Sequence, residues 1–398
     1  MLKKIQISQV EAGMFVHAIE GPWLDHALWK TRFLIKDDKT LATVRECGAQ
    51  ECWIDVAQGK DVARVRAAIQ LTTPDALVKK APVRKSMADE LQAASNILKR
   101  SKEAVTALFA EARMGHALNT SECRPLVDEI VGSVDRHADA LISLCRLKLA
   151  DEYTYMHSVS VCALMVSLGR QLGLDDGLCR DAGMAGLLHD LGKAAMPQDI
   201  INKPGKLTDE EFTIIKSHPV KGHEMLLASG VDNERVLDVA RHHHERIDGS
   251  GYPDKLAAEN ISMIARMSAV CDVYDAITSD RPYKAGWDPA ESVAKMASWQ
   301  GHFDPTVLQT FVKAIGIYPV GSLVRMASGK LAVVVEQNPK KLTAPKVKVF
   351  FSTKSGMPLE PKLIDLADSH VTEKIVARES PENWSFGYLN DLWATHIA

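Results

Sequence analysis

The sequence lacks long hydrophobic runs and a leader-like start. No window approaches about 18 uninterrupted apolar residues, the length at which a stretch becomes a candidate membrane-spanning helix. The first residues, Met-Leu-Lys-Lys-Ile-Gln-Ile-Ser, lack the continuous apolar segment of a secretory signal. We therefore expect a cytoplasmic protein that has no membrane partner.

The sequence also lacks an even number of cysteines and an excess of positive charge. The 398 residues include seven cysteines, and an odd number spread over a chain of this length is not typical of a disulfide framework. Lys and Arg number 48 against 51 Asp and Glu, which gives a net charge of −3. Without a general basic field, binding of a nucleic-acid polymer is not expected. An anionic substrate would have to be held by a local site.

The composition is otherwise that of a folded chain, with 46% apolar and 25% charged residues. Its length predicts two or three domains at about 100 to 200 residues each. Residues 1–65 alternate short apolar runs with turn residues, which predicts a small strand-rich accessory or regulatory domain. Residues 66–85 contain two prolines and a basic cluster and are expected to form a linker.

A helix is predicted over 86–120, where apolar residues recur at spacings of four and three. This stripe could be a dimer seam, but stripes of two or three heptads more often pack onto their own domain. Residues 121–317 follow a helical period, and residues 318–398 predict a β-hairpin plus a strand. The expected fold is mainly α: an all-helical core, a small strand-rich N-terminal domain and a C-terminal extension that contains a short β-hairpin.

Histidines gather with carboxylates in the helical part of the chain. Of 14 histidines, seven lie between His157 and His244, close in sequence to Asp190 and followed by Asp272. Neutral imidazoles and carboxylates together are ligands for Fe, Mn, Zn and similar divalent ions. Because buried unpaired charges are costly, such a cluster needs a reason, and metal coordination supplies one.

The segment Leu-Leu-His-Asp-Leu-Gly-Lys at 187–193 is the first of two chemical motifs. Its apolar flanks predict a buried helix turn in which His189 and Lys193, four residues apart, share one face. A carboxylate beside a ligating histidine, here Asp190, can bridge two cations, and such a pair clamps a phosphoryl centre. A salt-bridged His–Asp pair of the core explains this segment alone almost equally well. It does not explain the other ligand-type residues.

The second motif runs from His243 to Pro253. The adjacent histidines His243 and His244 end a predicted helix, and two glycines and a proline then form a tight loop. Backbone in such a loop can approach a ligand closely. The ring of Tyr252 can stack on a flat ring or form a hydrogen bond.

These motifs resemble those of the HD-GYP family of bacterial cyclic di-GMP phosphodiesterases, within the HD phosphohydrolase superfamily. The matching segments are HDLGK at 189–193, HHExxDGxGYP at 243–253, and the stretch from Asp272 to Lys284. The resemblance covers about residues 148–315. The N-terminal segment resembles, more weakly, the small accessory domain that often precedes HD-GYP domains.

The resemblance implies two divalent transition-metal ions, Fe or Mn. It assigns His157, His189, Asp190 and Asp272 to one metal and His218, His243 and His244 to the other, with Asp190 bridging. Some family members bind a third metal through a Glu four residues before the first histidine. Here that position is Tyr153, with Glu152 and Asp151 in a different helical register, so two metals are expected.

The resemblance also implies roles in catalysis and substrate binding. Lys193 would act with Asp190, orienting a metal-bridging hydroxide or stabilising developing charge. Residues Gly251, Tyr252 and Pro253 would line the substrate pocket, and Arg281 and Lys284 would contact phosphate.

The expected function is hydrolysis of cyclic di-GMP to pGpG, and possibly to GMP, by that hydroxide. Two alternatives stay open. The substrate could be another cyclic dinucleotide such as 3′,3′-cGAMP or another phosphoester. The chain could instead be a non-catalytic cyclic di-GMP sensor that binds partner proteins. A homodimer or a signalling partner is compatible with each of these.

Overall fold

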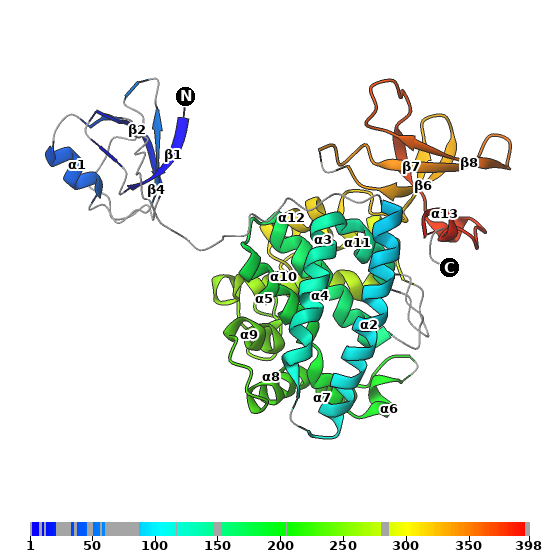
Figure 1. Ribbon diagram of the computed structural model, residues 1–398, viewed down its shortest axis with the longest axis horizontal. Helices are drawn as coiled ribbons and strands as arrows, with labels where there is room; N and C mark the ends of the chain where they lie inside the picture. Colours follow the sequence, from blue (N-terminus) through cyan, green and yellow to red (C-terminus); the bar gives the residue numbers. More distant parts are fainter. Residues whose placement is uncertain are drawn as a thin grey trace, which may run out of the picture. The chain divides into compact units, whose positions relative to one another are not determined.

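The computed structural model describes residues 2–7, 10–11, 13–20, 33–35, 38–45, 51–55, 58–59, 87–116, 118–146, 153–203, 205–279, 286–338 and 340–394. The chain divides into two compact units, Met1–Val78 and Lys79–Ala398 (Figure 1). The finer domain bounds expected from the sequence stay predictions.

The first unit is a small antiparallel sheet with one described helix. Its strands are β1 (Leu2–Gln6), β2 (Phe15–Glu20), β3 (Phe33–Leu34) and β4 (Glu51–Asp55), in the order β1-β4-β2-β3. Inward-facing Ile5, Val16 and Ile54 form its core, so the predicted strand-rich unit is confirmed. The sequence pattern does not predict helix α1 (Asp38–Arg45), since about two turns are too short for a clear apolar period.

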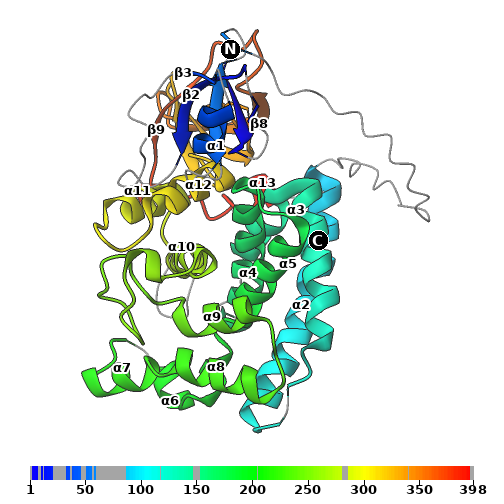
Figure 2. The same ribbon diagram turned by 90° about the vertical axis from the view of Figure 1, so that its left-hand side faces the viewer.

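The second unit begins with a helical core. Its helices are α2 (Met87–Arg113), α3 (Cys123–Arg146), α4 (Tyr153–Gln171), α5 (Asp176–Leu188), α6 (Gln198–Ile201), α7 (Asp209–Ile215), α8 (His218–Ala228), α9 (Glu234–His242), α10 (Met263–Thr278), α11 (Pro289–Ser298) and α12 (Pro305–Ile315). In Figure 2, α2, α3, α4 and α5 lie alongside one another, with α8, α9 and α10 beside them. The mainly helical fold class is therefore confirmed.

Helices α4 and α10 run through the centre of this core. Side chains around the whole circumference of each are buried, including Val159, Cys162 and Met165 on α4 and Met267 and Val270 on α10. A helix that is apolar on all sides has to be surrounded by protein. Polar residues on these two helices are consequently withdrawn from water, and they need partners inside the core.

The apolar stripe of α2 packs within its own unit. Leu91, Ala94, Val105, Leu108 and Ala112 are buried in the same core cluster as α3 and α4. Burial of these side chains accounts for the apolar period without a second copy of the chain. No described helix contains a stretch that is both apolar enough and long enough to cross a bilayer.

The C-terminal part is an antiparallel sheet with a short final helix. Its elements are β5 (Leu323–Met326), β6 (Lys330–Glu336), β7 (Lys346–Ser352), β8 (Met357–Asp365), β9 (Ile375–Arg378) and α13 (Asp391–Ala394). The strand order is β8-β7-β6-β5-β9. Strands β5 and β6 form the predicted hairpin, and β7 is the predicted further strand. The sequence pattern does not predict β8 because most of its residues are exposed, which leaves no alternation to detect.

Candidate active site

The first motif lies where α5 ends. Helix α5 stops at Leu188, and a turn leads into a 3-10 segment, η4 (Leu191–Ala195). Asp190, with φ −97° and ψ 7°, has left the helical conformation. The expectation that His189 and Lys193 share one face of a continuous helix is therefore wrong. Lys193 instead turns back, and its Nζ lies 2.5 Å from Oδ2 of Asp190.

A close approach of two backbones requires this bend. A Cβ atom on Gly192 would lie 1.9 Å from the carbonyl oxygen of His218 and 2.5 Å from the backbone nitrogen of Gly222. Only glycine fits at position 192, so η4 can lie directly against the start of α8. This contact brings His218 Nε2 to 3.2 Å from Oδ1 of Asp190.

The remaining residues come from three further elements, so the fold brings together all seven residues that the resemblance assigns to the metals. His157 lies on α4, Asp272 lies on α10, and His243 and His244 directly follow one another at the end of α9. The ligand atoms form two sets, each within 4.8 Å: His157, His189 and Asp272 in one, and Asp190, His218, His243 and His244 in the other. That these residues bind metals stays a prediction.

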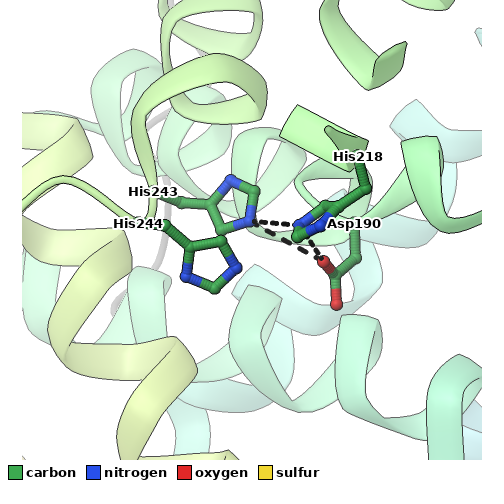
Figure 3. Close-up of side chains that lie close together, drawn as sticks. All are labelled: Asp190, His218, His243 and His244. Carbon is green, nitrogen blue, oxygen red and sulfur yellow. Dashed lines mark hydrogen bonds and ion pairs between the residues drawn. The ribbon is translucent and has the colours of Figure 1, made fainter. Parts of the chain in front are cut away.

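Asp190 faces both sets with different oxygen atoms. Its Oδ2 lies 3.5 Å from Nε2 of His157 and 3.4 Å from Nε2 of His189. Its Oδ1 points to the second set and lies 3.7 Å from Nε2 of His243 (Figure 3). A carboxylate placed in this way can bridge two cations.

Hydrogen bonds to the backbone orient three of the imidazole rings. The Nδ1 atoms of His189, His218 and His243 lie 2.7, 2.7 and 2.9 Å from the carbonyl oxygens of Gly186, Ile215 and Val239. Because a carbonyl only accepts, each Nδ1 is the donor, and each Nε2 faces the site.

Two of these Nε2 atoms face each other. Nε2 of His218 lies 3.1 Å from Nε2 of His243 (Figure 3). Burial, together with nearby His244, holds the pKa of His243 well below its usual value, so this ring is neutral. Burial also lowers the pKa of His244 to about 3. A divalent cation stabilises imidazoles that converge in this way.

The carboxylates of the site are anionic. Burial by itself would raise their pKa values, but Lys193 and His189 hold the pKa of Asp190 well below its usual value. The neighbouring His157 and His189 side chains have the same effect on the pKa of Asp272. Against the effect of burial, these two carboxylates raise the pKa of His189 to about 10. The site therefore attracts positive charge.

Two buried atoms of the site make no hydrogen bond among the described residues: Nε2 of His189 and Oδ1 of Asp190. Leaving such atoms unsatisfied in a protein interior is costly. Coordination of a cation would satisfy both atoms. The residues present therefore fit a divalent metal centre.

Asp275 is a buried residue of the site that the sequence motifs do not single out. Its Oδ2 lies 2.6 Å from Nδ1 of His157, and its Oδ1 accepts a hydrogen bond from the Ser160 hydroxyl. This carboxylate turns Nε2 of His157 toward Asp272, at 2.9 Å. A signal was available, since Asp272 and Asp275 are three residues apart on α10 and share a face.

The glycine-rich loop lies against the second set. A Cβ atom on Gly251 would lie 2.5 Å from the backbone nitrogen of Arg246 and 2.7 Å from the carbonyl oxygen of His244, so only glycine fits. The Tyr252 ring lies 4.7 Å from the His244 ring, centroid to centroid, at 30°. Tyr252 and Pro253 are joined by a cis peptide bond. A role of this loop in substrate binding stays a prediction.

Glu245 holds the same loop in place, although its position in the sequence suggests no such role. Its buried carboxylate accepts hydrogen bonds from the backbone N–H groups of Asp254, at 2.8 Å, and Leu256, at 3.1 Å. A Gln side chain has one acceptor oxygen, so Glu245→Gln leaves one of these donors facing an amide N–H.

We expect Glu245→Gln to lower the free energy of unfolding by about 1 to 3 kcal/mol, the usual cost of an unsatisfied buried group. Denaturant titration of the purified protein measures this loss. Glu259→Gln, at an exposed position of the same segment, is the matched control. Equal stability of the two variants would contradict this role of Glu245.

Some predicted residues cannot be placed. Arg281 and Lys284 lie outside the described residues, as do Asp151 and Glu152. His242, which the motif does not include, lies outside both sets of ligand atoms. Its Nδ1 is 2.7 Å from Asp238 and its Nε2 is 2.9 Å from Asp254.

Known proteins match both parts of the chain. The HD domain model matches residues 139–307, and a domain of unknown function (DUF3391) matches residues 2–123. A cyclic di-GMP phosphodiesterase of Pseudomonas aeruginosa is 52% identical over 399 residues, which cover 99% of this chain and 96% of that protein. The chain belongs to the HD-GYP family of cyclic di-GMP phosphodiesterases. The resemblance seen in the motifs is thereby confirmed.

Other relatives match less than half of this chain. The cyclic di-GMP phosphodiesterase response regulator RpfG of Xanthomonas campestris is 40% identical over 181 residues, 43% of this chain and 47% of that protein. A 3′3′-cGAMP-specific phosphodiesterase of Vibrio cholerae is 33% identical over 174 residues, 43% of this chain and 39% of that protein. Relatives named for two different cyclic dinucleotide substrates thus resemble parts of this chain.

Proposed function

We propose that this HD-GYP protein hydrolyses cyclic di-GMP to pGpG at a centre of two divalent transition-metal ions, Fe or Mn. One observation carries the proposal: Asp190 presents its two carboxylate oxygens to two separate sets of imidazole and carboxylate ligands. The full-length similarity to a protein named as a cyclic di-GMP phosphodiesterase supports the choice of substrate.

The ligand sets divide the metal-binding work. His157, His189 and Asp272 would hold one cation and His218, His243 and His244 the other, with Asp190 shared between them. When bound, two such cations lower the pKa of water and neutralise charge on a phosphodiester. We propose two cations rather than three because Tyr153 occupies the position of the Glu that binds a third. Three metal ions per chain in elemental analysis would contradict this count.

The protein's own groups position and stabilise the phosphodiester. Lys193 keeps Asp190 anionic, and about a quarter of its side chain (27%) is exposed, so its ammonium can also reach a bound anion. Positive charge at this point stabilises the negative charge that develops on phosphoryl oxygens. Tyr252 covers His244 and would form one wall of the substrate site.

Product analysis tests this function. The purified protein is incubated with cyclic di-GMP in the presence of Mn, Fe(II), Mg or no added metal, and nucleotides are separated. We expect pGpG with Mn or Fe(II), and loss of turnover when a chelator removes the metal. Whether GMP follows is read from the same samples.

Two outcomes would overturn the proposal. Faster turnover of 3′,3′-cGAMP than of cyclic di-GMP would reassign the substrate, as in the relative of Vibrio cholerae. Tight binding of cyclic di-GMP without products, while metal is bound, would make the chain a sensor. We further propose that the protein acts in the cytoplasm, as a homodimer or with a signalling partner.

A further inference from the structure

Beside the candidate active site, Lys216 provides an ammonium group that pairs with no carboxylate of the described residues. It lies in the turn between α7 and α8. Two other lysines of this region are paired: Lys203 with Glu211 at 2.7 Å, and Lys221 with Glu224 at 3.0 Å. Within the described ranges, no carboxylate lies within ion-pair distance of Lys216.

Two aromatic rings hold this ammonium near the site. Its Nζ lies 4.5 Å from the ring centroid of Phe212 and 5.5 Å from that of Tyr252. The Tyr252 ring in turn covers His244. A cation–π contact attracts a cation but does not neutralise it. The positive charge of Lys216 therefore remains available to an anion bound next to Tyr252.

A cyclic dinucleotide needs such a charge. It contains two phosphodiester groups, and only one of them can lie at the His/Asp centre at a time. Lys193 serves that centre through its contact with Asp190. The other phosphodiester keeps its negative charge and requires a separate cation.

We propose that Lys216 binds the phosphodiester that is not being cleaved and thereby favours cyclic dinucleotides over esters with one phosphate. This inference rests on the proposed function, because it assumes a substrate with two phosphodiesters. Lys216 is then a binding residue that determines specificity, not a metal ligand.

The test compares Lys216→Met with Lys221→Met, an exposed lysine on the neighbouring helix that serves as the control. For cyclic di-GMP we expect Lys216→Met to raise KM about tenfold with kcat changed less than about twofold, since a binding contact is lost. The fold-loss in kcat/KM on bis(4-nitrophenyl) phosphate, which has one phosphate, should be several times smaller. Lys216→Arg should retain most of the affinity.

An unchanged KM for cyclic di-GMP in Lys216→Met, or equal fold-losses on both substrates, would overturn the inference. Failure of the proposed function has a different signature: the wild-type protein cleaves the one-phosphate ester and no cyclic dinucleotide. In that case, binding of a phosphorothioate analogue of cyclic di-GMP decides. Weaker binding to Lys216→Met than to wild type supports the role of Lys216, and equal binding refutes it.

Discussion

Asp190→Asn is expected to lower kcat/KM for cyclic di-GMP by at least about a thousandfold, while the fold stays intact. An amide cannot offer two anionic oxygens to two cations, and its N–H₂ group would face His218 or Lys193. Two bound metals contribute several kcal/mol of transition-state stabilisation, and each 1.4 kcal/mol is about tenfold in rate. Steady-state kinetics measure the loss of kcat/KM. Elemental analysis of the same preparation measures the loss of bound metal.

A matched control for this variant is Asp128→Asn. Asp128 is a surface carboxylate that pairs with Arg180 at 2.6 Å, and such exposed pairs contribute little to stability. We expect this variant to keep wild-type kinetics and metal content. Undiminished turnover in purified Asp190→Asn would refute the assignment of Asp190 as the shared ligand.

Asp275→Asn is expected to weaken metal binding by about 10- to 100-fold, the usual effect of removing a residue that orients a ligating histidine. The Asn side chain keeps the size of Asp275 but removes the charge that faces Nδ1 of His157 at 2.6 Å. The His157 ring then becomes a weaker and less firmly oriented ligand. Competition with a chromogenic chelator measures the affinity, and excess metal should restore most of the turnover.

Restoration by metal separates a positioning role from a purely structural one, because added metal would not repair a misfolded core. Ser160→Ala is the control, since it removes only the second hydrogen bond to Asp275 and leaves His157 untouched. We expect a smaller loss of affinity in Ser160→Ala than in Asp275→Asn. Wild-type metal affinity in Asp275→Asn would show that His157 does not depend on this carboxylate.

Much of the site could be predicted because its residues contrast with their neighbours in the chain. Imidazoles and carboxylates are rare together in apolar helices, so His189 and Asp190 are conspicuous between leucines. The seven residues that the resemblance assigns to the metals are brought within reach of one another by α4, α8, α9, α10 and the turn that follows α5. The assignment of the metals themselves stays a prediction.

Other features could not be predicted because they depend on contacts distant in sequence. The apolar pattern continues through Leu191, so nothing local shows that α5 ends at Leu188. The bend follows from the approach of Gly192 to Gly222, which is thirty residues away. Glu245 likewise resembles any loop carboxylate until the backbone donors of Asp254 and Leu256 surround it.

The hydrogen bonds of the histidine Nδ1 atoms imply an order in which the site can be assembled. The rings of His189, His218 and His243 are anchored to carbonyls three or four residues earlier, so each can be oriented as soon as its own turn forms. His157 depends instead on Asp275, 118 residues further along the chain. In the second ligand set, the orientations of the His218 and His243 rings are thus fixed by local folding. The first set is completed only when α10 docks against α4, which makes that docking the step that closes the centre.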